Sequence, residues 1–115
     1  MLNVLLVAAG GAIGAVARYG AVQIVSKFFA FLVGTMLVNI FGSLLIGVLM
    51  AKLQSEPMKL LLVTGVLGGF TTFSAFSWDI LQLMQKQQFA AALIYVLGSV
   101  ILSLVAVYFG YMIAK

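Results

Sequence analysis

The stretch MKLLLVTGVLGGFTTFSAFSWDILQLM, residues 58–84, decides the fold of this chain. It is long enough and apolar enough to cross a bilayer as a helix, which needs roughly 20 residues. Its middle, however, is rich in glycine and β-branched threonine, which are poor helix formers. These residues are Gly65, Gly68, Gly69, Thr71 and Thr72. We therefore predict a membrane helix that is broken near residues 68–72.

A break at that depth suggests a function. Irregular backbone inside a membrane is tolerated only where it is buried in protein or lines a cavity. In transport proteins, broken helices direct their free amide and carbonyl groups toward ions. After the break, Phe73 and Phe76 share one helix face, with Ser74 and Ser77 beside them. Aromatic packing between helices is the ordinary explanation of this pattern, and an ion pathway is the alternative.

The rest of the chain has the same apolar character as this stretch. Of its 115 residues, 65% are hydrophobic, more than a water-soluble chain of this length could bury. The six basic and two acidic residues divide the chain into four apolar segments, 2–26, 28–51, 58–84 and 89–114. Their runs are continuous, whereas membrane strands would alternate apolar with polar residues. We predict an all-α integral membrane protein whose single domain, 1–115, has four transmembrane helices.

Composition also excludes several classes of protein. The chain contains no cysteine and no histidine, so it has no disulfide, no thiolate or imidazole metal site and no histidine-based catalysis. We therefore expect no enzyme. The net charge of +4 comes from dispersed basic residues, which argues against a nucleic-acid surface. The first segment begins Met1-Leu2-Asn3, without Lys or Arg, and is too long for a signal peptide, so we expect it to remain.

The charges between the segments are nearly balanced. Four spans place the basic residues on two sides, with Lys52, Lys59 and Lys115 on one, and Lys27, Lys86 and the nearby Arg18 on the other. Orientation in a membrane follows the difference in Lys and Arg between loops, and this difference is small. We therefore predict that the chain inserts in both orientations and forms an antiparallel homodimer. A fixed topology is the alternative.

Polar and small residues recur at intervals of four in three segments. The stripes are Gly10, Gly14 and Arg18; Thr35, Asn39, Ser43 and Gly47; and Tyr95, Ser99 and Ser103. Small residues allow membrane helices to approach closely, and hydroxyl groups often bond between helices. For Arg18 we favour a structural role, pairing with helix-end carbonyl groups or a partner chain, over anion binding. Asn39 and the hydroxyl groups could equally touch a solute.

Three strings in this sequence resemble a known family. They are GGAIGAVARY at residues 10–19, GTMLVN at residues 34–39 and GGFTTFSAF at residues 68–76. The chain is similar in these strings, and over its whole length in size and span number, to the small fluoride channels called Fluc or CrcB. The resemblance implies an antiparallel, dual-topology homodimer in the bacterial inner membrane. Its two pores would export fluoride passively and so confer fluoride resistance.

The resemblance also implies roles for particular residues. Asn39 would donate its amide to fluoride, Phe73 and Phe76 would offer ring edges, and the stripe Tyr95, Ser99 and Ser103 would form a polar track. Thr72 and Ser74 are assigned to the same pore. A structural sodium ion at the dimer centre would be held by the backbone carbonyl groups of Gly68 and Thr71, and Arg18 would supply a structural or vestibule charge. The partners implied are a second copy, fluoride and lipid, without nucleic acid.

Two other functions remain open beside this one. A small proton-coupled multidrug exporter would have a similar size but would need a titratable carboxylate within the membrane. The only acidic residue within a predicted span is Asp79, where we expect the family to prefer Glu. A non-transporting scaffold subunit would use its polar stripes only to hold helices together. The absence of a nucleotide-binding motif favours passive transport over a pump.

Overall fold

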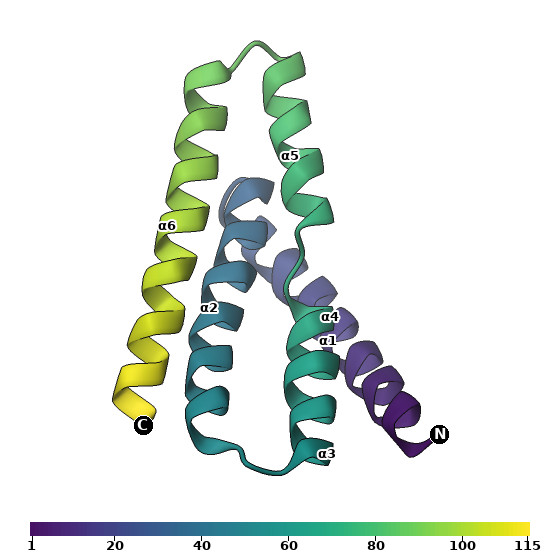
Figure 1. The fold of residues 1–115 in the computed structure, drawn as a ribbon. Helices are drawn as coiled ribbons and strands as arrows, with labels where there is room; N and C mark the ends of the chain where they lie inside the picture. Colours follow the sequence, from purple (N-terminus) through teal and green to yellow (C-terminus); the bar gives the residue numbers. More distant parts are fainter.

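The computed structural model describes all residues, 1–115, and every regular element in it is helical. Its elements are α1 (Leu2–Ser26), α2 (Phe31–Lys52), α3 (Glu56–Lys59), the π-helix η1 (Leu60–Leu67), α4 (Gly68–Phe70), α5 (Ser74–Gln85) and α6 (Phe89–Ala114). Elements α3 to α5 together form the third span (Figure 1). Four helices are long and apolar enough to cross a membrane, which confirms the all-α, four-span prediction.

The helix bounds differ slightly from the predicted segments in the middle of the chain. Helix α2 begins at Phe31 rather than at residue 28, because residues 27–30 form the turn that follows α1. The third span begins at Glu56 rather than at residue 58, because the Ser55 side chain accepts a hydrogen bond from the Met58 amide and caps the helix. Pro57 suits this first turn, where its missing N–H costs nothing.

The break in the third span is present. Helix α4 ends at Phe70, Thr71 is extended with φ −84° and ψ 157°, and α5 begins at Ser74. The break therefore lies at residues 71–73, at the carboxyl end of the predicted interval. The π-helix that precedes it was not predicted from the sequence. Such helices are rare and occur often near functional sites.

Glycines bring the helices into backbone contact. A Cβ atom added to Gly10 would lie 2.9 Å from the Gly65 Cα atom, and one added to Gly14 would lie 2.9 Å from the Phe70 amide nitrogen. Helix α1 therefore packs against the third span at these small residues. Figure 1 shows the two elements crossing. Helices α2 and α6 meet in the same way, because a Cβ on Gly47 would overlap the α6 backbone.

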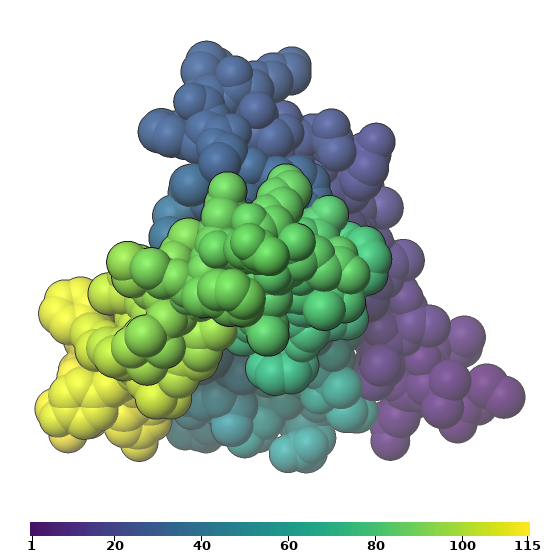
Figure 2. All heavy atoms as spheres, turned by 90° about the horizontal axis from the view of Figure 1, so that it is seen from above, coloured from purple at the N-terminus to yellow at the C-terminus, as the bar shows by residue number.

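Most of the surface of a single chain remains open to its surroundings. Only 18 of 115 residues are buried, too few for a chain that folds in water, so lipid or further protein must cover the rest. The amino-terminal part of α1 and the carboxyl-terminal part of α6 lie on opposite sides of the molecule (Figure 2). The main buried cluster lies between α5 and α6 and consists of Phe76, Leu83, Ala92 and Tyr95.

Candidate functional site

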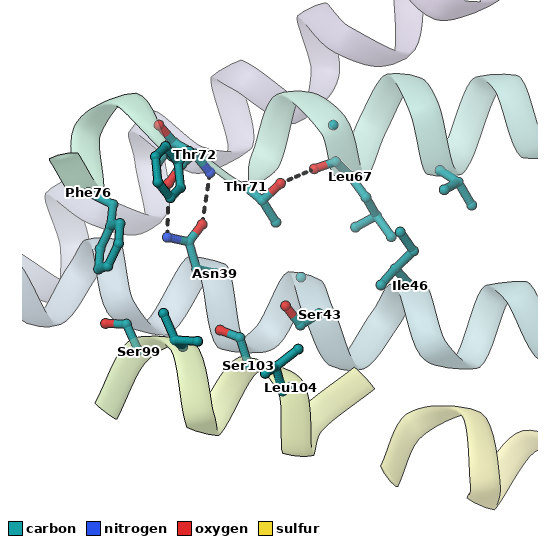
Figure 3. A pocket seen from close by; sticks show the side chains of 15 residues that line it. Asn39, Ser43, Ile46, Leu67, Thr71, Thr72, Phe76, Ser99, Ser103 and Leu104 are labelled. Carbon is teal, nitrogen blue, oxygen red and sulfur yellow. Dashed lines mark hydrogen bonds between the residues drawn. The ribbon is translucent and has the colours of Figure 1, made fainter. Parts of the chain in front are cut away.

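A cavity of about 420 Å³ lies beside the break, between the third span and helices α2 and α6 (Figure 3). None of the 15 residues that line it is charged. They are Asn39, Gly42, Ser43, Ile46, Val63, Leu67, Gly68, Thr71, Thr72, Phe73, Phe76, Ser99, Val100, Ser103 and Leu104. The structure thus brings together most of the site residues predicted from the sequence, and it leaves Arg18, Ser74 and Tyr95 outside the lining.

Asn39 holds the break through two hydrogen bonds to Thr72. Its Nδ2 atom donates to the Thr72 carbonyl oxygen at 3.0 Å, and its Oδ1 atom accepts from the Thr72 amide at 2.8 Å (Figure 3). These bonds satisfy backbone groups that would otherwise be unpaired at membrane depth. A carboxamide nitrogen carries two hydrogens, so one N–H of Asn39 remains without a partner in the chain.

The first turn of α5 begins at the cavity. The Thr72 hydroxyl accepts from the Ala75 amide at 3.1 Å and so caps this helix, and it lies 3.2 Å from the Ser74 hydroxyl oxygen. Unpaired amides and aligned peptide dipoles give a helix amino terminus a partial positive charge. The amino end of α5 therefore favours an anion over a cation at this side of the cavity.

The two phenyl rings predicted to share a face lie together, but they differ in burial. The ring centroids of Phe73 and Phe76 are 5.6 Å apart with an interplanar angle of 55°. Phe76 is 6% exposed and also contacts the Tyr95 ring, with a centroid distance of 5.2 Å. Phe73 is 77% exposed. Its ring therefore lies on a surface that only lipid or another chain can cover.

The hydroxyl stripe on α6 is divided between two environments. Ser99 and Ser103 line the cavity, and the buried Ser99 hydroxyl has no hydrogen-bond partner. The Tyr95 hydroxyl instead donates to the Asp79 Oδ2 atom at 2.9 Å. The three hydroxyl groups thus do not form one continuous ladder in this chain.

The burial of Asp79 and its hydrogen bond to Tyr95 were not predicted from the sequence. The Asp79 side chain is fully buried, and its second oxygen, Oδ1, has no partner. It borders a second cavity of about 560 Å³, which Gln82 and Lys86 also line. An acidic residue inside a membrane span is rare enough to have drawn attention by itself. Only the fold shows that its partner is Tyr95.

We expect Tyr95→Phe to destabilise the protein by about 2–4 kcal/mol, because it leaves a buried carboxyl group without its hydrogen-bond donor. The measurement is the thermal unfolding of the purified protein in detergent. Tyr108→Phe is the matched control, since Tyr108 lies on the same helix but is 67% exposed and forms no hydrogen bond within the chain. Equal unfolding temperatures for the two variants would contradict the prediction.

Arg18 reaches from α1 to the carboxyl end of α4. Its Nε atom donates to the Gly69 carbonyl oxygen at 3.1 Å, which is the kind of structural contact predicted for it from the sequence. A cation is favourable at a helix carboxyl terminus, where carbonyl groups lack amide partners. The neighbouring carbonyl groups of Gly68 and Thr71 accept no hydrogen bond from the chain. Two oxygen atoms that suit a cation are thus free at the break.

Comparison with known proteins identifies the family. The family model described as "CrcB-like protein, Camphor Resistance (CrcB)" matches residues 5–111. Over 123 residues the chain is 46% identical to the fluoride-specific ion channel FluC of Caulobacter sp. (strain K31), covering 100% of this chain and 96% of the relative. It is 47% identical over 117 residues to the protein of that name from Rhizobium meliloti (strain 1021), covering 96% and 94%. The chain therefore belongs to the CrcB family.

Proposed function

We propose that this protein is a channel that passes fluoride through the membrane. The observation that carries the proposal is the uncharged cavity at the helix break, which combines hydrogen-bond donors with phenyl rings. Relatives named fluoride-specific ion channels, 44–47% identical to this chain, support fluoride as the ion. A channel of this kind is not an enzyme.

The residues around the cavity suit a small, strongly hydrated anion. The free N–H of Asn39 and the unpaired hydroxyl of Ser99 can each replace a water molecule of the hydration shell. Aromatic rings carry a positive edge, so Phe76 can face an anion without a full positive charge. Conduction requires binding that is weak enough to release the ion. The absence of Lys and Arg from the lining meets that requirement.

The direction of transport follows from the membrane potential. A unit charge gains about 2.3 kcal/mol per 100 mV as it crosses the membrane. A cell that is negative inside therefore expels fluoride without ATP, and this export provides fluoride resistance. We place the protein in the bacterial inner membrane, where such a potential exists.

An antiparallel homodimer with two pores would complete the pathway. In one chain the Phe73 ring is 77% exposed although it borders the cavity, so a second copy would complete this wall. The nearly equal division of basic residues between the two sides allows both orientations. The large exposed apolar surface supplies the contact area between the copies, with lipid covering the remainder.

A sodium ion would serve as a structural ligand at the break. The free carbonyl groups of Gly68 and Thr71 fit this role, because unwound backbone carbonyls in membrane proteins coordinate sodium. Arg18 already satisfies the Gly69 carbonyl, so it supports the helix end beside the ion rather than replacing it. The bound ion would supply a central positive charge that joins two copies.

The structure favours neither a proton-coupled exporter nor a scaffold subunit. A proton-coupled exporter would need a free carboxylate in the cavity that carries the drug. Asp79 is instead bonded to Tyr95, and the cavity of about 560 Å³ that it borders is separate from the one at the helix break. A buried hydroxyl without a hydrogen-bond partner, such as that of Ser99, lowers stability unless a ligand bonds to it. A scaffold subunit, which binds no solute, would gain nothing from such a group.

The test is anion efflux from liposomes that contain only this protein, in buffer with both sodium and potassium, where a potassium ionophore clamps the potential and carries the counter-charge. We expect fluoride to leave the vesicles while chloride leaves no faster than from liposomes without protein. Electrodes selective for each anion measure the two rates. Equal fluoride and chloride rates, or no fluoride flux from correctly folded protein, would overturn the proposal.

A further inference from the structure

We propose that Gly42 on α2 positions the Thr71 carbonyl group for sodium, which makes it a positioning residue of the sodium site. This inference rests on the sodium ion of the proposed function. The residue itself provides no ligand atom and acts only through the Thr71 side chain. Three contacts around Thr71 carry the argument.

The first contact joins Thr71 to Gly42. Gly42 is buried, and a Cβ atom added to it would overlap the Thr71 Cγ2 methyl group. The same Cβ would lie 3.4 Å from the Phe70 Cδ2 atom, which is ordinary contact. Only the Thr71 methyl group therefore requires a glycine here. Alanine would be the better helix former, so helix propensity does not explain the glycine.

The second and third contacts fix the other side of Thr71. Its hydroxyl donates to the Leu67 carbonyl oxygen at 2.9 Å, and its amide donates to the same oxygen at 3.0 Å (Figure 3). The side chain is thus held between the preceding helical turn and α2. It cannot move away from α2 without giving up a hydrogen bond.

These contacts determine where the free carbonyl points. Thr71 leaves the helix with ψ 157°, which turns its carbonyl away from the helix and prevents it from meeting an amide of α5. A side chain pushed by a Cβ at position 42 would carry this peptide group with it. Metal affinity depends on such supporting contacts, whose loss typically weakens binding about 10–100-fold.

The experiment compares Gly42→Ala with variants that isolate the clash. Thr71→Ser removes the methyl group but keeps the hydroxyl, so Gly42→Ala combined with Thr71→Ser removes the overlap. Gly98→Ala is the control, because a Cβ on Gly98 meets no atom of the chain within 4 Å. The thermal unfolding of each purified protein is measured against sodium concentration, with N-methylglucamine keeping the ionic strength constant.

We expect sodium to stabilise the wild-type protein and Gly42→Ala to raise the half-saturating sodium concentration about tenfold or more. The double variant should return to within about threefold of wild type, and Gly98→Ala should match wild type. Recovery in the double variant distinguishes a displaced methyl group from general damage to α2. If Gly42→Ala alone does not fold, the double variant and Thr71→Ser decide the question.

Two results would overturn the inference. One is a wild-type sodium response in folded Gly42→Ala, and the other is a lost response in the double variant while Thr71→Ser retains it. If the unfolding temperature of the wild-type protein does not depend on sodium concentration, both the proposed sodium site and this inference are wrong. Fluoride efflux from the same preparation would still report on the channel itself, so the two failures are distinguishable.

Discussion

Asn39→Asp is expected to lower fluoride efflux by about a hundredfold to a thousandfold while the protein stays folded. The carboxylate keeps an acceptor for the Thr72 amide but loses the donor that now meets the Thr72 carbonyl oxygen. It also removes the unpaired N–H of a residue that lines the cavity and places negative charge there. Efflux from liposomes with a fluoride electrode measures the change.

The size of this effect follows from the charge. Two unit charges 4 Å apart repel by about 4 kcal/mol at an effective dielectric constant of 20. Because every 1.4 kcal/mol is a factor of ten, this repulsion alone corresponds to about a thousandfold. The lost hydrogen bond between residue 39 and the Thr72 carbonyl adds a smaller destabilisation of the folded protein, about 1–3 kcal/mol. The backbone at the break would become more mobile as a result.

The control is Asn3→Asp, which makes the same chemical change at an exposed position at the start of α1. It should leave efflux unchanged. Size-exclusion profiles and circular dichroism of both variants show whether the fold persists. Wild-type efflux in a folded Asn39→Asp protein would mean that the cavity at the break is not the ion pathway.

Phe76→Ile is expected to reduce fluoride efflux about thirtyfold or more, with a cost of about 1–2 kcal/mol in stability. Phe76 is buried, lines the cavity and lies between the rings of Phe73 and Tyr95. Isoleucine keeps much of the apolar bulk but has no ring edge. A desolvated ion can gain about 2 kcal/mol from a ring quadrupole, which corresponds to the expected factor.

The matched control for this variant is Phe41→Ile. Phe41 also belongs to an aromatic pair, with its centroid 6.3 Å from that of Phe70, but it does not line the cavity. Its replacement should change efflux by less than about threefold. If the two isoleucine variants lose efflux equally, the effect comes from helix packing rather than from a ring edge in the pore.

The sequence alone determined the number of spans and the break. In a bilayer the solvent is apolar, so a continuous apolar segment of sufficient length becomes a membrane helix whatever its neighbours are. Local propensity likewise predicted the interruption near residues 68–72, one residue short of the end of the observed break, because glycine and threonine weaken any helix. The same local chemistry made Asn39 and the small-residue stripe of α1 stand out.

Tertiary structure decided which groups those residues contact. Asn39 and Thr72 are 33 positions apart, and Arg18 and Gly69 are 51 apart. Each pairing depends on the depth and rotation of two helices. Contacts at Gly10 and Gly14 set these for α1 and the third span, and the contact at Gly42 sets them for α2 and the third span. The same packing turned Tyr95 away from the cavity toward Asp79. Residue spacing gives the face of a helix, but the partner on that face is set by how the helices pack.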